Sequence, residues 1–477
     1  MTRYLLLILI AFPIAVAALA DAGESTWPQF RGPGGLGLGT GKPPVAFSAE
    51  KDAEKNLLWK VEVPHGHSSP CILGNKIFLT GLDTNKLITF CLDRTTGKEL
   101  WRAVAPVDKI EPTHRIGSAA APTPCTDGER VYVYFGSFGL LAYDLKGQEI
   151  WNKPLPVPVV EFGTGASPIL AGGKVIIISD QDTGGYLLAV DSRTGAEVWR
   201  VDRSDFRRSF SSPFLWQHDG IEEIIVAGSL WVRSYEIKDG HERWSCHGVA
   251  RVSNATPTAG DGVLLISSWN VGGDESDRVI VPPFEEFMLA NDKDKDGKLI
   301  KDEFPNGPLK SRFSQIDVNK DERVTREEYD HTRGMFARAE NQLFTIKPGG
   351  QGDITATHLL WKTNKHLPYV SSPLCYHGRI YAMKNGGLAS CYDAKNGSVF
   401  YQAERVDAAG DYYSSSIGAN DCIYIASQKG TVVVLDAGDS FKVLARNPLG
   451  EEIFATPAIL DGRIYIRTVK HLFVFGE

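Results

Sequence analysis

Several common signatures are missing from this chain of 477 residues. It has no C-x-x-C pair and no C-x-x-C-H sequence, and its seven cysteines are never adjacent. Neither G-x-S-x-G nor H-E-x-x-H occurs, so no motif indicates a serine hydrolase or a zinc protease. His65, His67 and His114 belong to no motif, and we expect them to be solvated loop residues. The net charge of −7 and the lack of a basic block disfavour nucleic-acid binding and docking to an anionic membrane.

Seven cysteines are an odd number, so at least one is unpaired within a monomer. Cys91 and Cys391 occupy matching places in residues 90–93 and 390–393. Such a repeated position favours a buried strand residue over a redox site. We therefore expect small hydrophobic cysteines, with one or more disulfides as the alternative.

Long hydrophobic runs are also scarce, and the one near the N-terminus predicts a secretory signal. Arg3 supplies the positive charge, residues 5–18 are apolar, and small residues end the run at Ala18, Ala20 and Ala22. We expect residues 1–22 to be cleaved, since the run is short for a membrane anchor. No cysteine is near for lipidation, and no later stretch is long enough to span a bilayer. The prediction is an exported protein, periplasmic or extracellular, with no transmembrane segment after cleavage.

What the chain does contain is a motif that recurs eight times. A stretch of small residues leads through a β-rich run and a Gly turn to an aromatic residue, as from Pro70 to Trp101. The copies begin at Pro70, Pro124, Pro168, Pro213, Pro257, Pro373, Ser416 and Pro457. Successive copies lie 41 to 54 residues apart, except for one gap of 116. A period in the forties with four strand-like segments is typical of propeller blades.

The sequence therefore predicts an all-β fold, an eight-bladed β-propeller built from residues 23–272 and 342–477. Aromatic residues fall in the outermost strand, where they can wedge between blades: Trp101, Trp151, Trp199, Trp244, Trp361 and Tyr401. Residues 57–61 contain Trp59 without a preceding blade, whereas the last repeat has only three strands. We expect strand 57–61 to complete the last blade and close the ring. Seven blades are the alternative, if one weak copy is not a blade.

The repeat resembles a known family. Residues 92–101 and 190–199 each place Asp before the turn, Gly within it and Trp after it, which is similar to the quinoprotein-type, or PQQ-like, β-propeller repeat. The Trp-Pro-Gln-Phe-Arg-Gly sequence at Trp27 resembles the start of many secreted bacterial PQQ-like propeller proteins. The resemblance covers about residues 27–272 and 342–477 and implies the fold. It does not define an activity, because the family contains both quinone-dependent dehydrogenases and non-enzymatic scaffolds.

A charged, helix-compatible segment, residues 273–341, interrupts the fifth repeat. Residues 292–303 match the twelve-residue EF-hand loop, with Asp at positions 1, 3 and 5, Gly297 at position 6 and Glu at position 12. Ca²⁺ takes about six to eight oxygen ligands, which alternating carboxylates on a tight loop can supply. The predicted ligands are Asp292, Asp294, Asp296, the Lys298 carbonyl and Glu303.

A second loop, residues 317–328, departs from the pattern at one position. Glu322 replaces the turn Gly, and a non-Gly residue at positive φ costs about 1 kcal/mol. We expect a weaker calcium site, or alternatively a structural loop that only supports the first one. The predicted ligands are Asp317, Asn319, Asp321, the Arg323 carbonyl and Glu328. Val324 can pair with Leu299, and this EF-hand pair is expected on the face of the propeller that carries the inter-blade loops.

The inter-blade loops on that face contain polar and aromatic residues. They are Arg115, Phe162, Arg207, Arg208, Arg251, Tyr369, Tyr412 and Tyr413. Either these side chains line a central mouth as a ligand site, or they pack against each other and cap the loops.

The resemblance implies two functional classes. One is a PQQ-dependent dehydrogenase, in which the quinone carries the chemistry with Ca²⁺ as Lewis acid. The adjacent cysteine pair of many such enzymes and a haem site are absent from this chain, and the apparent calcium ligands lie in the insert. The other class is a scaffold similar to the propeller of the outer-membrane β-barrel assembly machinery, whose lipidation cysteine is also missing. We predict an exported calcium-binding scaffold for an unknown protein or glycan partner, with the dehydrogenase as the alternative.

Overall fold

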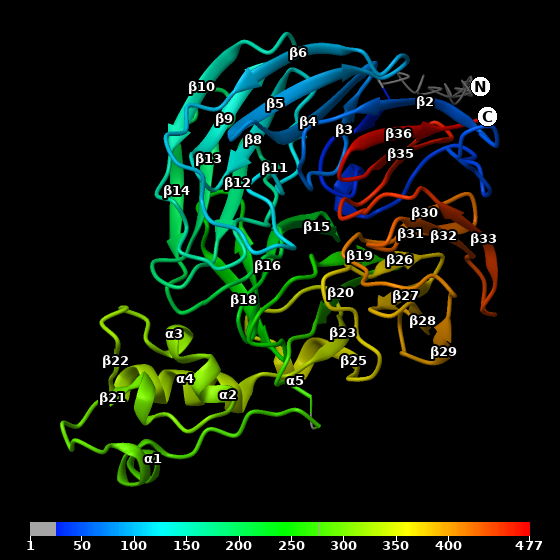
Figure 1. The fold of residues 1–477 in the computed structure, drawn as a ribbon. Coiled ribbons are helices and arrows are strands. Elements are labelled where there is room, and N and C mark those ends of the chain that lie inside the picture. Colours follow the sequence, from blue (N-terminus) through cyan, green and yellow to red (C-terminus); the bar gives the residue numbers. More distant parts are fainter. Residues whose placement is uncertain (1–24, 275) are drawn as a thin grey trace, which may run out of the picture.

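The structure, a computed structural model, describes residues 25–274 and 276–477, so the predicted signal peptide at 1–22 lies outside the described residues. Eight antiparallel sheets with four main strands each follow one another along the chain and surround a common axis (Figure 1). The predicted all-β, eight-bladed propeller is confirmed, and the seven-bladed alternative is wrong. Within the described part of the chain, no helix has the length and apolar character needed to cross a membrane.

The strands of each blade are given from first to fourth. Blade 1 contains β3 (Cys71–Leu73), β4 (Lys76–Asp83), β5 (Lys86–Asp93) and β6 (Glu99–Val104), and blade 2 contains β7 (Cys125–Thr126), β8 (Arg130–Phe135), β9 (Gly139–Asp144) and β10 (Glu149–Pro154). Blade 3 contains β11 (Ile169–Ala171), β12 (Lys174–Ser179), β13 (Tyr186–Asp191) and β14 (Glu197–Asp202), and blade 4 contains β15 (Phe214–His218), β16 (Ile221–Ala227), β17 (Trp231–Glu236) and β18 (Glu242–His247).

In the same order, blade 5 contains β19 (Thr258–Gly260), β20 (Val263–Ser268), β23 (Gln342–Ile346) and β25 (Leu359–Thr363), and blade 6 contains β26 (Leu374–Tyr376), β27 (Arg379–Lys384), β28 (Leu388–Asp393) and β29 (Val399–Arg405). Blade 7 contains β30 (Ile417–Ala419), β31 (Cys422–Ala426), β32 (Thr431–Asp436) and β33 (Val443–Pro448), and blade 8 contains β34 (Ala458–Leu460), β35 (Arg463–Arg467), β36 (His471–Phe475) and β2 (Leu57–Glu62). A short strand, β24 (Gly352–Asp353), adds to the edge of blade 4 through β18, and helix α5 (Thr355–His358) follows it.

The position of a strand in its blade decides its burial. Second and third strands such as β12 and β13 are β-branched or apolar and almost fully buried, because neighbouring blades cover both of their faces. Fourth strands such as β6 and β14 alternate between exposed and more buried residues, as expected at the rim. The seven cysteines are all buried and unpaired. Cys91 and Cys391 lie on third strands opposite Trp101 and Tyr401, so the small-hydrophobe prediction is confirmed.

The ring is closed by the N-terminal part of the chain. Strand β2 pairs antiparallel with β36, with Trp59 opposite Val474 and Glu62 opposite His471. Figure 1 shows the blue β2 beside the red β36. The predicted closing strand is confirmed, and it covers an edge that would otherwise expose unpaired backbone groups.

Rim tryptophans fasten five of the eight blades to the next blade. Trp101 Nε1 donates to Leu145 O of the following blade at 3.1 Å, and its ring lies against Gly147. A Cβ at Gly147 would come within 2.5 Å of the indole, so only glycine allows this approach. The same pairing joins Trp59 to Gly97, Trp151 to Gly195, Trp199 to Gly240 and Trp361 to Gly397. Trp244 is different, since its Nε1 donates to the buried Glu223 at 3.0 Å.

The segment before β2 crosses the ring axis. It contains β1 (Thr26–Trp27), which pairs with β3, and a 3-10 turn, η1 (Pro33–Gly35). Its backbone accepts a hydrogen bond from Thr126 in blade 2, and Arg31 Nη2 donates to Pro373 O in blade 6 at 2.9 Å. Burial lowers the pKa of Arg31 to about 9. Contacts with both sides of the ring make this segment the floor of the central channel.

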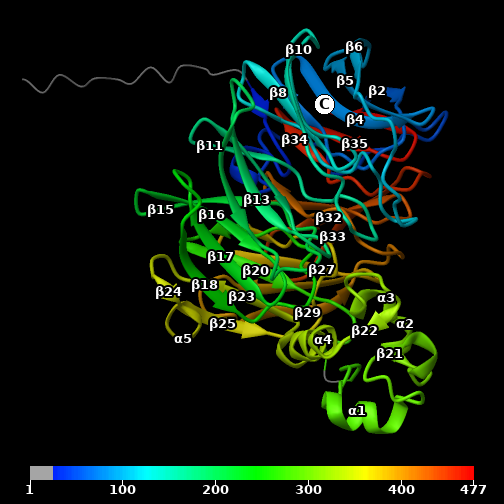
Figure 2. The same ribbon diagram turned by 90° about the vertical axis from the view of Figure 1, so that its left-hand side faces the viewer.

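The chain leaves the sheet of blade 5 between β20 and β23. There it forms α1 (Phe284–Asn291), β21 (Leu299–Ile300), η2 (Lys301–Glu303), α2 (Pro308–Ser311), α3 (Phe313–Ile316), β22 (Arg323–Val324) and α4 (Arg326–Arg338). These elements, called the insert below, have their own buried core that includes Phe284, Phe287 and Phe313. Figure 2 shows the insert projecting beside the sheets.

Candidate functional site

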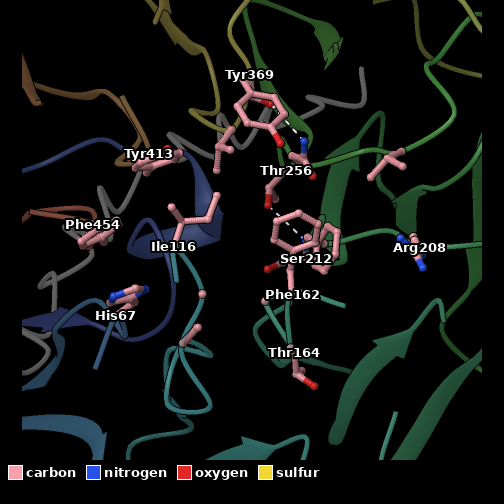
Figure 3. A pocket seen from close by; sticks show the side chains of 18 of the residues that line it. His67, Ile116, Phe162, Thr164, Arg208, Ser212, Thr256, Tyr369, Tyr413 and Phe454 are labelled. Atoms are coloured by element: carbon pink, nitrogen blue, oxygen red, sulfur yellow. Dashed lines mark hydrogen bonds between the residues drawn. The ribbon is translucent and has the colours of Figure 1, made fainter. Parts of the chain in front are cut away.

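A cavity of about 490 Å³ lies where the inter-blade loops meet. Its lining comes from most of the blades, from Phe30 of the N-terminal segment and from Ser311, Arg312 and Gln315 of the insert. Figure 3 shows His67, Phe454 and Tyr413 together on one side, with Phe162 and Arg208 across the cavity from them. The insert therefore lies on the face that carries the inter-blade loops, as predicted, and it contributes side chains to the mouth.

A ring of eight hydroxyl groups surrounds the axis. Each residue donates its backbone N–H to the side-chain oxygen of its counterpart in the next blade, over 2.8 to 3.2 Å. The members are Ser69, Thr123, Ser167, Ser212, Thr256, Ser372, Ser415 and Thr456. Thr456 N donates back to Ser69 Oγ, which completes the circle. All eight line the cavity, and their hydroxyl hydrogens remain available to a ligand.

Aromatic side chains form one wall of the cavity. The His67 ring stacks on Phe454 at 4.3 Å between centroids, and Phe454 stacks on Tyr413 at 5.5 Å. Burial, with the nearby charges of His65 and Arg467, lowers the pKa of His67 to about 3, so this imidazole is neutral. The prediction of a solvated loop histidine is wrong for His67, because the neighbouring blade covers its ring.

Positive charge gathers on the side of the cavity that faces the insert. Arg208 is neutralised, since its guanidinium binds Asp182 at 2.5 Å and Glu161 at 2.9 Å. Arg251 and Arg312 also line the cavity, and both contact the ring of Phe336 from α4. Burial and the neighbouring arginines lower the pKa of Arg251 to about 10.

The loop at 292–303 folds back on its own carboxylates. Asp292 accepts the backbone N–H groups of Lys295 and Gly297, and Asp296 accepts that of Lys298. Oxygens of Asp292, Asp294 and Asp296 lie within 4.8 Å of one another. Glu303 is buried and accepts the N–H groups of residues 293 and 300, so its carboxylate faces the same loop.

The loop at 317–328 repeats this arrangement position by position. Asp317 accepts the N–H of Glu322 at 3.0 Å, and Glu328 accepts the N–H groups of residues 318 and 325. Glu322 has φ of 66°, so it takes the left-handed conformation that Gly297 takes in the first loop at 79°. Asp317 is only 4% exposed, and its Oδ1 has no hydrogen-bond partner in the part of the chain that the structure describes.

The two loops are joined to each other and to the propeller. Leu299 pairs with Val324 between β21 and β22, which confirms the predicted pairing. Arg323 Nη1 donates to Asp296 Oδ2 at 3.0 Å, so a positively charged side chain of the second loop binds a carboxylate of the first loop. On the propeller side, Arg207 Nη2 donates to Gln315 O at 2.6 Å. Gln315 comes two residues before Asp317, so the second loop is coupled directly to the mouth.

The residues predicted for the mouth have different places. Phe162, Arg208, Arg251, Tyr369 and Tyr413 line the cavity, as predicted for a central mouth, and Phe162, Tyr369 and Tyr413 also pack on neighbouring aromatic rings. Arg207 lies at the boundary with the insert, and Arg115 lies outside the lining. Tyr412 is buried in the protein core, where its hydroxyl donates to Ala408 O. Sequence reasoning missed the hydroxyl ring, although a Ser or Thr before the proline of seven repeats, and Ser415 before Ser416 in the other, was a visible signal.

Eight four-stranded blades around a hydroxyl-lined axis, fastened by rim tryptophans, define a β-propeller of the PQQ-like repeat class. A sequence profile described as "Outer membrane protein assembly factor BamB" matches residues 45–182, 84–272 and 310–471. These matches cover more than half of the chain, which therefore belongs to this family. The predicted PQQ-like repeat is confirmed.

Three similar proteins share 25% identity or less with this chain. A quinohemoprotein alcohol dehydrogenase, ADH IIB of Pseudomonas putida, is 25% identical over 249 residues, which is 48% of this chain and 36% of that protein. The chain thus spans only about a third of this relative's length. The crystal structure of BamB from Moraxella catarrhalis has a TM-score of 0.57 at 12% identity and covers 88% of this chain and 99% of that one. Quinohemoprotein alcohol dehydrogenase ADHIIG of Pseudomonas putida has a TM-score of 0.54 at 12% identity, covering 95% and 80%.

The cavity does not have the donor set for a quinone with a calcium ion beside it. The quinone's carboxylates would find arginines and hydroxyls, but a hard divalent cation needs several carboxylate or carbonyl oxygens. Glu161 is the one carboxylate that lines the cavity among the described residues, and it is already bound to Arg208. Apart from hydroxyl groups, the other side-chain oxygens in the described part of the lining are the amides of Asn254, Asn270 and Gln315, and Asn270 Oδ1 already accepts a hydrogen bond from Arg251. The acidic cluster of Asp292, Asp294 and Asp296 is in the insert and does not line the cavity.

Proposed function

We propose that this protein is an exported, calcium-binding β-propeller that acts as a binding scaffold, with the central cavity as its ligand site. Of the two partner classes, protein and glycan, the cavity favours a glycan. The observation that carries this choice is the combination of stacked aromatic rings with a continuous ring of hydroxyl groups. Aromatic faces pack against the C–H faces of sugar rings, and hydroxyl groups pair with sugar hydroxyls.

Calcium binding belongs to the insert, as an EF-hand pair. The proposed domain division is a propeller of residues 23–272 and 342–477, with the EF-hand pair at 273–341 in blade 5. Two loops with the same backbone path and with carboxylates at positions 1, 5 and 12 support one cation in each. The unpartnered Oδ1 of Asp317 supports the second site in particular, since a buried carboxylate oxygen without a donor is costly unless a cation binds it. Calcium would then hold α3 and Gln315 against the propeller mouth.

Export is part of the proposal because of the signal-like residues 1–22. It agrees with a scaffold whose ligand is outside the cytoplasm. It also suits the low affinity of extracellular EF-hand modules, with dissociation constants of about 10⁻⁴–10⁻³ M.

A PQQ-dependent dehydrogenase is the second candidate, and the match to ADH IIB favours it. The cavity volume would admit a flat ring system. Against it stands the scarcity of carboxylates in the lining, where Glu161 is the one described carboxylate and is already paired with Arg208.

The experiment is a binding survey with the purified mature protein in Ca²⁺. Neutral and acidic oligosaccharides and immobilised periplasmic proteins are tested with wild type, Tyr413→Ala and Phe400→Ala. Tyr413 lines the cavity, whereas Phe400 is an exposed aromatic residue on the rim strand β29 and serves as the control. We expect glycan binding that Tyr413→Ala weakens roughly tenfold, because a stacking surface is removed. Chelation should weaken it as well.

The same survey can reject the proposal. Adding PQQ, Ca²⁺ and a redox dye with alcohols or sugars must give no turnover. Sustained dye reduction that requires PQQ would replace the scaffold by the dehydrogenase. Glycan binding that is equal in both variants would place the ligand outside the cavity.

A further inference from the structure

The boundary between the insert and the propeller contains a second, small cavity of about 20 Å³. Four arginines line it: Arg207, Arg208 and Arg251 from the propeller and Arg312 from the insert. Arg208, Arg251, Arg312 and Gln315 also line the central cavity, so the two spaces adjoin. We refer to the small one as the arginine pocket.

Three of these arginines have only neutral acceptors. Arg207 Nη2 donates to Gln315 O, Arg251 Nη2 to Asn270 Oδ1 at 2.6 Å, and Arg312 Nη1 to Pro308 O at 3.0 Å. None of the three forms an ion pair with any residue in 25–274 or 276–477. In contrast, Arg208 beside them has both Asp182 and Glu161. Three of the four arginines around the pocket thus lack a direct carboxylate partner among the described residues.

Arg207 provides a second and independent observation. It is only 7% exposed, and its Nε has no hydrogen-bond partner among the described residues. A buried guanidinium N–H without an acceptor is costly, because it has lost its hydrogen bonds to water. The pocket therefore has a donor without an acceptor as well as arginines without a direct carboxylate partner among the described residues.

Arg251 of the propeller and Arg312 of the insert both line this pocket. The guanidinium carbons of Arg251 and Arg312 lie 5.1 and 5.9 Å from the centroid of the same ring, Phe336. Two like charges that line one small, partly desolvated pocket repel each other, and the charge of Arg312 indeed lowers the pKa of Arg251. An anion bound between the two guanidinium groups would attract both of them and so offset their repulsion. Planar guanidinium groups suit the oxygens of carboxylate or sulfate.

We propose that the arginine pocket is an oxyanion site, and that the ligand of the central cavity is an acidic saccharide carrying a carboxylate or sulfate group. A volume of about 20 Å³ admits roughly one oxygen atom, since a water needs about 10–15 Å³ by the same measure. The oxyanion therefore enters with one oxygen, while the rest of the ligand stays in the larger cavity. This inference rests on the proposed glycan-binding function and names its substrate class. Because Arg312 belongs to the insert, the bound anion also fastens the insert to the mouth.

The test begins with inorganic sulfate as the probe and the full mature protein saturated with Ca²⁺. Thermal unfolding and calorimetry compare sulfate with chloride at equal ionic strength for wild type, Arg251→Gln, Arg312→Gln and Arg333→Gln. Arg333 is an exposed arginine of α4 and controls for the loss of one positive charge. Sulfate also stabilises proteins in general, because it is excluded from their surfaces. The difference in sulfate effect between the variants therefore reports binding at the pocket. We expect sulfate binding that Arg251→Gln or Arg312→Gln weakens about tenfold or more, while Arg333→Gln retains it.

A second arm uses uronate-containing, sulfated and neutral oligosaccharides of equal length. We expect the acidic ligands to compete with sulfate, and their preference over neutral ones to disappear in Arg312→Gln. Arg312 is half-buried at the boundary, so this variant remains informative if Arg251→Gln fails to fold. Equal sulfate binding in wild type and Arg312→Gln would overturn the oxyanion site, even if glycans bind. Sulfate binding without any saccharide binding would instead overturn the glycan assignment and leave the anion site standing.

Discussion

At the scale of single residues, Glu111 is a buried carboxyl group next to the lining residue Thr164. It is 5% exposed, and Thr164 donates its backbone N–H and its hydroxyl to the carboxylate at 3.4 Å each. Burial raises its pKa to about 7, although the two Thr164 bonds act in the opposite direction. The folded protein therefore holds a proton on Glu111 that the unfolded chain releases near its ordinary pKa of 4.5.

This shift predicts a pH dependence of stability. Because the folded-state pKa is raised, the contribution of Glu111 is complete below pH 4.5 and is lost as the pH rises through 7. Glu111→Gln should remove a decline of roughly 3 kcal/mol in the free energy of unfolding between about pH 4.5 and 7.5. Urea denaturation at closely spaced pH values measures it. The exposed Glu149→Gln should leave the decline unchanged, and an unchanged profile in Glu111→Gln would show that this carboxyl ionises freely.

Residues of this kind could not be found from the sequence. Glu111, His67 and Arg207 belong to loops without a motif, and their properties arise from what other blades place beside them. His67 is covered by Phe454, which belongs to the last repeat of the chain. The loop residues Phe162 and Tyr413 were candidates because of their type, but their common cavity depends on the closure of the ring.

At the scale of elements, the paired calcium loops can be tested one at a time. Glu303 and Glu328 hold the same position in their loops, and each also caps the turn that follows. Gln keeps this capping role but loses the charge and the second strong ligand oxygen. The substitutions therefore test cation binding rather than folding.

Calcium calorimetry should show two sites in the wild-type protein. Glu303→Gln and Glu328→Gln should each weaken one site roughly tenfold or more, because ligand charge sets affinity over several orders of magnitude. Glu327→Gln, at an exposed neighbouring residue, should keep both sites. Two unaltered sites in Glu328→Gln would mean that the second loop is only structural.

Much at this scale was predictable because the information is local. Residues 292–303 and 317–328 contain their own turn and carboxylate positions, so the conformation of each loop follows from its own short sequence. Glu322 was expected to weaken the second site because it must take a positive φ, and it does adopt the left-handed conformation at 66°. The pairing of Leu299 with Val324 and the N–H groups held by Asp317 and Glu328 keep the loop path despite this residue.

At the scale of the whole molecule, the ring of eight hydroxyl groups and the closing strand both follow from the repetition of one blade motif along the chain. The repeat spacing predicted the number of blades, and an unpaired strand at each end predicted the closure. The floor made by the N-terminal segment was not predictable, because its Trp27 and Arg31 contact blades from opposite sides of the ring. Contacts of this kind do not recur at a fixed spacing along the sequence.

Closure of the ring makes a specific prediction about stability. Trp59 fastens blade 8 to blade 1 through Arg94 O and Gly97, and Trp101 fastens blade 1 to blade 2 through Leu145 O and Gly147. Both tryptophans are half-buried and donate over 3.1 Å, so they form a matched pair. In a closed ring every junction must be intact, whereas the end of an open array frays on its own.

We therefore expect Trp59→Ala and Trp101→Ala to lower the free energy of unfolding by similar amounts, about 3 kcal/mol each. The measurement is urea denaturation followed by both fluorescence and circular dichroism, so that local fraying is separated from global unfolding. Leu58→Ala, at an exposed residue of the same closing strand, should cost much less. If Trp59→Ala caused only an early, partial transition and left the main one in place, the junction between the chain's two ends would be dispensable and the ring would not behave as one cooperative unit.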